Sequence, residues 1–107
     1  MNATTTYSNW SGNVQGSQWI GLSWQKREKS GVQNVTVNWT DAEGSSFKIT
    51  VRILNSNLTS LYSDDINYLG STTFPASLVS GQEYLLQGKK TSMFAGKTFI
   101  KGNWRIN

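Results

Sequence analysis

The 107-residue sequence contains no cysteine and no histidine. The absence of cysteine excludes disulfide bonds, thiolate metal sites and cysteine nucleophiles. The absence of histidine removes the commonest general base and the commonest metal-ligating side chain. Serine nucleophiles would therefore lack their usual activating partner. We expect the protein not to be an enzyme and to use no cofactor or metal.

Acidic residues are also few: Glu28, Asp41, Glu43, Asp64, Asp65 and Glu83. Paired carboxylates can hydrolyse glycosidic bonds, and clustered carboxylates can bind Ca²⁺. We place all six in turns or at strand edges, where Asp and Asn shape the backbone. Turn formation is therefore our interpretation of these residues.

Long apolar runs are absent as well, since no segment approaches the roughly 20 apolar residues of a membrane-spanning helix. Met1 is followed at once by polar residues, not by the apolar stretch of an export signal. Either the protein is cytoplasmic, or Met1 stands in place of a removed leader. We expect a secreted, extracellular protein, because Ser, Thr, Asn and Gly are abundant and charged residues are only 15%.

What the sequence does contain is two-residue alternation of apolar and polar side chains, as in half-buried strands. The alternation is clearest over 35–39 and 47–53, which we predict to form a β-hairpin across the loop 41–45. In 20–24 it places Trp24 in the core and Trp19 outside. Further strands are expected in 4–10, 67–74, 82–90 and the C-terminal segment from Phe99, with one helical turn within 57–66. About seven strands in a single domain, residues 1–107, indicate an antiparallel β-sandwich.

One local motif refines this fold. Residues 78–86 have the form L-x-x-G-x-x-Y-x-L, with Leu78, Gly81, Tyr84 and Leu86 at the fixed positions. This pattern resembles the tyrosine corner of immunoglobulin-like and fibronectin type III sandwiches. The resemblance implies an immunoglobulin-like strand order, with the Tyr84 ring in the core and its hydroxyl bonded to nearby backbone.

A second resemblance is more general. The Thr- and Asn-rich start, the lack of cysteine and the closing Gly102-Asn103-Trp104 resemble small secreted β-proteins of Gram-positive bacteria, some of them bacteriocin-like. This resemblance implies an extracellular location and keeps an antimicrobial activity open.

Aromatic and basic side chains are the candidates for ligand binding. Trp10 lies in a polar stretch, Trp19 is expected outside, and Trp104 follows a possible bulge at Gly102-Asn103. Exposed indoles commonly mark contact surfaces. The last 24 residues add a basic region without acids, made of Lys89, Lys90, Lys97, Lys101 and Arg105. Such a region attracts anionic polymers or membrane surfaces.

These features predict a non-catalytic secreted binding domain. Its expected partner is a cell-surface glycan, an anionic polymer or a membrane surface, contacted by the exposed indoles and the basic region. Two alternatives stay open: a secreted antimicrobial or membrane-active protein, and a structural or adhesin module. Nucleic acid is not the expected partner, because single-strand-binding barrels of the OB type have five strands. The sequence leaves the oligomeric state open.

Overall fold

The computed structural model describes residues 7–27, 31–93 and 95–106, which form eight β-strands. Their bounds are β1 (Ser8–Val14), β2 (Ile20–Lys26), β3 (Gly31–Ala42), β4 (Ile49–Leu54), β5 (Ser60–Ile66), β6 (Ser71–Leu78), β7 (Glu83–Lys90) and β8 (Thr98–Ile106). None of the described residues forms a helix that could span a membrane.

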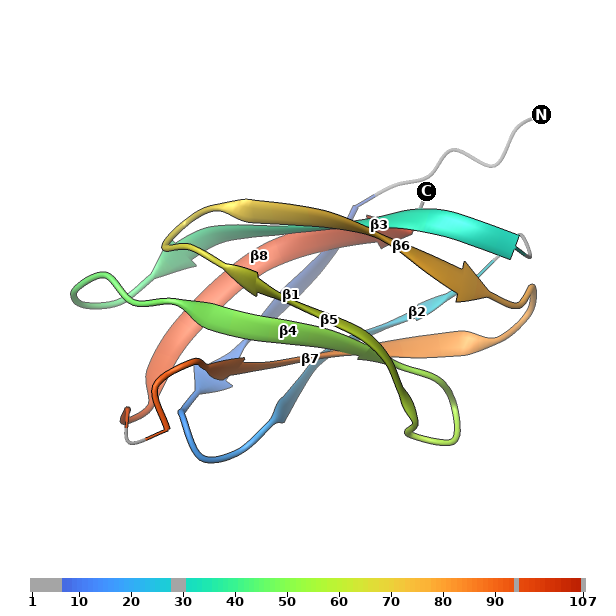
Figure 1. Ribbon diagram of the computed structural model, residues 1–107. Helices are drawn as coiled ribbons and strands as arrows, with labels where there is room; N and C mark the ends of the chain where they lie inside the picture. The colour runs from blue at the N-terminus through green and yellow to red at the C-terminus, as the bar shows by residue number, and fades with distance from the viewer. Residues whose placement is uncertain (1–6, 28–30, 94, 107) are drawn as a thin grey trace.

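The strands make two four-stranded antiparallel sheets, which confirms the predicted sandwich. Sheet A has the order β1-β8-β3-β6 and sheet B the order β2-β7-β4-β5. Figure 1 shows the two layers, with β3, β6 and β8 in one and β4, β5 and β7 in the other. Among these eight strands, β4 and β5 are the consecutive pair that shares a sheet. Every other connection crosses between the layers.

This connectivity differs from the expected immunoglobulin-like order. Immunoglobulin-type sandwiches group their strands as ABED and CFG, whereas eight strands in two interleaved Greek keys form a jelly roll. The tyrosine corner itself is present, since the Tyr84 hydroxyl accepts a hydrogen bond from the Val79 backbone N–H at 2.7 Å. The motif describes one local turn before a penultimate strand. It carries no information on how distant strands pair.

The predicted hairpin between 35–39 and 47–53 is wrong for a related reason. β3 pairs with β6 and β8, whereas β4 pairs with β5 and β7. The alternation correctly identifies the inward side chains, since Val35, Val37, Ile49 and Val51 are all buried. Alternation defines a buried face but not a partner strand. The two apolar faces meet across the core instead of lying side by side.

Two other segments depart from the sequence-based predictions. The helical turn expected within 57–66 is instead β5. The strand expected to end at Pro75 continues through it as β6, an edge strand, where a missing backbone N–H is tolerated. The first strand begins at Ser8, and the earlier part of the predicted segment 4–10 lies outside the described residues.

The core contains three of the five indoles, those of Trp10, Trp39 and Trp104. The Trp10 ring lies against the backbone of β8 at Gly102. A Cβ added at Gly102 would come within 2.0 Å of the Asn38 carbonyl oxygen and 2.5 Å of the Trp10 ring. The chain therefore requires glycine here for β1, β8 and β3 to approach one another.

We predict that Gly102→Ala destabilises the fold by at least about 2 kcal/mol, because overpacking against backbone cannot be relieved by a rotamer change. The matched control is Gly96→Ala, where an added Cβ meets nothing within 4 Å. Its effect is expected within about 0.5 kcal/mol. Urea unfolding followed by tryptophan fluorescence measures both. Equal stability of the two variants would contradict this account of the core.

Candidate functional site

The indoles are distributed differently from the sequence-based expectation. Trp10 and Trp104 were predicted as ligand-contact residues, with the orientation of Trp104 left open, but only 2% and 0% of their surfaces are accessible. The bulge expected at Gly102-Asn103 is absent, since β1 and β8 stay in continuous register from Ser8↔Trp104 to Val14↔Thr98. Without a bulge, Trp104 keeps the phase of the inward side chains of β8. Both predicted contact residues are therefore part of the core.

The predicted burial of Trp24 is also wrong, but in the opposite sense. It was expected in the core, yet 49% of its surface is exposed. The register of β2 against β7 shifts between Gly21 and Ser23, and one extra residue moves all following side chains to the other face. Trp19, expected outside, is half-buried just before β2. The bulge thus makes Trp24 the most exposed of the five indoles.

The five basic residues of the C-terminal region do not form one patch. Lys90 is buried, with its Nζ 2.5 Å from the Thr98 hydroxyl and 4.4 Å from the Phe47 ring centroid. Burial lowers the pKa of Lys90 because it disfavours the charged ammonium. Lys89 precedes Lys90 in a strand and therefore points to the opposite face.

The other three cations lie elsewhere on the molecule. Lys97 is exposed in the β7–β8 connection. Lys101 is exposed with its Nζ 3.9 Å from a carboxylate oxygen of Asp41. The Arg105 guanidinium lies 4.7 Å from the Tyr7 ring centroid. Of the predicted site residues, the structure brings Trp19 together with Lys89, and Trp10 together with Lys101.

The outer face of sheet B carries the first of these pairs. Its side chains lie in three rows across the strands, given by the register as Trp24–Leu85–Leu54, Gly21–Gln87–Arg52 and Lys89–Thr50–Asp65. Neighbouring rows are two residues apart, or about 7 Å. Leu54 and Leu85 are buried but do not belong to the core cluster, as expected for outward side chains covered by their neighbours.

The indole of Trp19 holds two cations on this face. The Arg52 guanidinium carbon lies 4.1 Å from the ring centroid, and Lys89 Nζ lies 5.1 Å from it. Arg52 Nε also donates a 2.8 Å hydrogen bond to Gln87 Oε1. Burial lowers the pKa of Arg52 by desolvating its charged form. Among the described residues, neither cation has a carboxylate oxygen within 4.0 Å.

The second pair lies at a groove of about 400 Å³ beside sheet A. Its polar lining comes from Asn9, Ser11, Thr40, Lys101 and Asn103, and its apolar lining from Trp10, Leu22 and Gly102. A β-bulge interrupts the pairing of β3 with β8 between Trp39 and Asp41, next to this groove.

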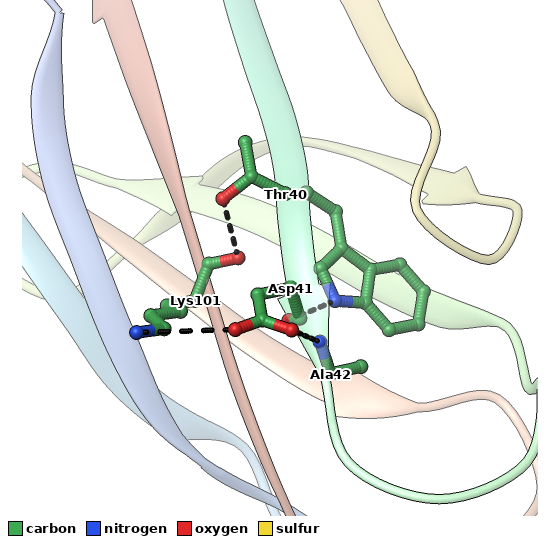
Figure 2. A network of polar contacts seen from close by, with 5 residues as sticks. Thr40, Asp41, Ala42 and Lys101 are labelled. Atoms are coloured by element: carbon green, nitrogen blue, oxygen red, sulfur yellow. Dashed lines mark hydrogen bonds and ion pairs between the residues drawn. The ribbon is translucent and has the colours of Figure 1, made fainter.

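Most polar groups around that bulge are already engaged within the protein (Figure 2). The Thr40 hydroxyl donates to the Lys101 carbonyl oxygen at 3.2 Å, and the Asp41 carboxylate accepts the Ala42 N–H at 2.9 Å and faces the Lys101 ammonium. The Trp39 indole N–H donates to the Asp41 carbonyl oxygen at 2.9 Å. These contacts stabilise the bulge and engage Thr40, Asp41 and Lys101 within the protein. On the outer face of sheet B, Trp24 is exposed, and Arg52 and Lys89 have no carboxylate contact among the described residues. This face is therefore the better candidate site.

Sequence reasoning missed three contributors to this site. Trp24 was assigned to the core because the alternation was continued through Gly21, although a glycine inside a strand can mark a bulge such as the one observed here. Arg52 and Gln87 appeared only as polar members of alternating strands. The pairing of β4 with β7, which places these two side chains opposite each other, could not be read from local patterns.

Comparison with solved structures shows the fold alone. The Yersinia pseudotuberculosis-derived mitogen is similar with a TM-score of 0.59 and 12% identity, over 97% of this chain and 88% of that one. An arabinose-bound α-L-arabinofuranosidase is similar with a TM-score of 0.52 and 13% identity over 87% of this chain. This chain spans only 18% of that enzyme's length. No protein-family model and no curated protein sequence matches the chain.

We predict opposite outcomes for removing two of the indoles. Trp10→Ala should cost about 3–5 kcal/mol, because it leaves a large cavity in the core. Trp24→Ala should cost less than about 1 kcal/mol, because the ring is half in water. Thermal and urea unfolding measure the difference. A Trp24→Ala protein as unstable as Trp10→Ala would contradict the placement of Trp24 on the surface.

Proposed function

We propose that the protein is a non-catalytic secreted binding domain that recognises a cell-surface glycan through the outer face of sheet B. The observation that carries the proposal is the presence of Trp19 and Trp24 on the same sheet face, together with the polar heads of Arg52, Gln87 and Lys89. The half-exposed indole of Trp24 offers a flat apolar surface on which a sugar ring can stack. The amide and the cations beside it can bond to ring substituents.

The geometry also favours binding over bond cleavage. The described residues contain no group of three or more acidic side chains close enough to hold a metal ion. Two acidic residues lie at the edges of this face. Asp65 accepts a 2.7 Å hydrogen bond from the Thr50 hydroxyl, and Glu83 lies opposite Lys26 in the register of β2 with β7. Asp65 lies in the row of Lys89, and Glu83 lies six residues from Lys89 along β7, so the two acids do not form a general acid and base pair across the site.

Two observations support an extracellular location. The chain shares its fold with a bacterially derived mitogen, a kind of protein that acts on other cells. Its surface is rich in Ser, Thr and Asn. Both observations fit a domain that works outside the cell that makes it.

One observation favours the membrane-active alternative. Leu58 in the β4–β5 turn is 61% exposed and Val79 in the β6–β7 turn is 57% exposed. The two turns lie at the same end of the molecule (Figure 1), and the Ser56 hydroxyl donates to the Glu83 carbonyl oxygen between them at 3.1 Å. Exposed apolar tips of this kind can enter a lipid interface. Release of dye from anionic vesicles by the wild-type protein would support this alternative.

We predict that a glycan array detects binding by the wild-type protein and that Trp24→Ala weakens it at least about tenfold, because an interfacial indole commonly contributes more than 1 kcal/mol. The matched control is Tyr7→Ala, which removes an exposed ring that lies over Arg105, a residue of sheet A. It should bind as the wild type does. Unchanged binding by a folded Trp24→Ala protein would refute the assignment of this face.

A further inference from the structure

The Trp19 indole is not an open platform for a sugar ring. Its face is covered by the Arg52 guanidinium at 4.1 Å and the Lys89 ammonium at 5.1 Å from the centroid. Cation–π attraction holds a cation over the face of an aromatic ring. The ring therefore acts as a support that fixes two flexible cations in one place. The open indole of the face is that of Trp24.

Arg52 is held in a defined orientation. Its Nε donates to Gln87 Oε1 at 2.8 Å, and its plane rests near Trp19. The terminal Nη groups form no hydrogen bond with any other described residue. A guanidinium fixed at Nε presents its Nη donors as a planar fork, which matches two oxygens of a carboxylate, sulfate or phosphate. Orientation before binding reduces the entropy lost when a ligand binds.

The charge around this fork is not compensated. Asp65 faces the same sheet surface but is bonded to Thr50 at 2.7 Å, and Glu83 lies at the other end of β7 opposite Lys26. Neither carboxylate lies within 4.0 Å of Arg52 or Lys89. Arg52 and Lys89 carry like charges near one ring, so their mutual repulsion falls when an anion binds to either of them.

The row that contains Arg52 offers space for the rest of such a ligand. Gly21 lies opposite Gln87 and contributes no side chain. A Cβ placed there would make only an ordinary contact of 3.6 Å with Leu85. Beyond it, Trp24 lies opposite Leu85, four residues from Lys89 along β7, or about 13 Å at strand spacing. A ligand that contacts both the cations and Trp24 must be extended.

We propose that Arg52 and Lys89, positioned by Trp19 and Gln87, bind a sulfate or carboxylate group of an acidic polysaccharide whose chain continues over Gly21 to Trp24. The inference rests on the proposed function and narrows its target from glycans in general to acidic ones. The anion provides the charged contact, and the Trp24 ring provides the apolar one. A single lipid headgroup would satisfy the cations but would not reach the indole.

The test measures affinity by biolayer interferometry for three probes: heparin for sulfate, polygalacturonate for carboxylate, and dextran for a neutral chain. The wild-type protein should bind at least one acidic probe, and the affinity should fall as salt rises. Arg52→Gln and Lys89→Gln should each weaken that binding about tenfold or more, as expected for loss of a charge-assisted hydrogen bond. Arg52→Lys should lie between, because it keeps the charge and loses the fork.

The matched control is Lys97→Gln, which removes the same charge from an exposed position in the β7–β8 connection. Its affinity should stay within about threefold of wild type, because only screened long-range attraction is lost. A further test variant, Gly21→Tyr, keeps both cations but places a ring at the β2 end of the row that contains Arg52, next to the row of Trp24. It should abolish polysaccharide binding while the protein remains folded by circular dichroism.

The outcomes separate the two proposals. Loss of binding in Trp24→Ala with no effect of Arg52→Gln or Lys89→Gln would overturn the anion site and leave glycan binding intact. Equal losses in Lys97→Gln and Lys89→Gln would also overturn it, since net charge alone would then explain the affinity. Binding to phosphatidylserine vesicles but to none of the three polysaccharides would overturn both proposals.

Discussion

The two sheets meet over three buried indoles, and this packing determines which side chains remain for the outer faces. Trp10, Trp39 and Trp104 all come from sheet A, and Gly102 lets the first of them lie flat on the β8 backbone. Most aromatic volume of sheet A is thereby used in the core. On the outer face of sheet B, Trp24 and the Trp19 ring lie with Arg52 and Lys89, whereas the inward positions of β4 are filled by aliphatic residues.

The strand pairings of the described residues shift register at three points, and two of these shifts affect the candidate surfaces. In β2 an extra residue between Gly21 and Ser23 turns Trp24 outward. In β3 the irregularity at Thr40 is fixed by hydrogen bonds to Lys101 and Asp41. The β2 bulge exposes the Trp24 indole on sheet B. The β3 bulge engages polar groups beside sheet A in hydrogen bonds within the protein. The two faces therefore differ in what they can offer a ligand.

How much the sequence could predict follows from these same points. Regular alternation correctly identified the buried side of β3 and β4, and the tyrosine corner correctly placed the Tyr84 hydroxyl near backbone. Strand pairing could not be predicted, because alternation is the same for a hairpin and for two strands facing each other across a core. Trp24 and Trp104 were misplaced because one bulge was unforeseen and another was expected where the ladder is continuous. The prediction of one basic patch from the lysines of the C-terminal segment was also wrong, because adjacent side chains in a strand point to opposite faces. Lys89 therefore points outward, whereas Lys90 is buried.

The outer face of sheet B concentrates features that do not help the fold. About half of the Trp24 surface is exposed to water. Burial partly desolvates the Arg52 guanidinium. Lys89 lies at the same Trp19 ring as Arg52, and among the described residues no carboxylate lies within 4.0 Å of either cation. Cation–π contacts with Trp19 hold both cations on this face. A neutral residue at position 52 would avoid both the desolvation and the repulsion. Proteins break local rules of this kind mainly where function requires it. Three such departures within one sheet face, beside a glycine that leaves the surface open, are the physical reason for assigning the binding site there.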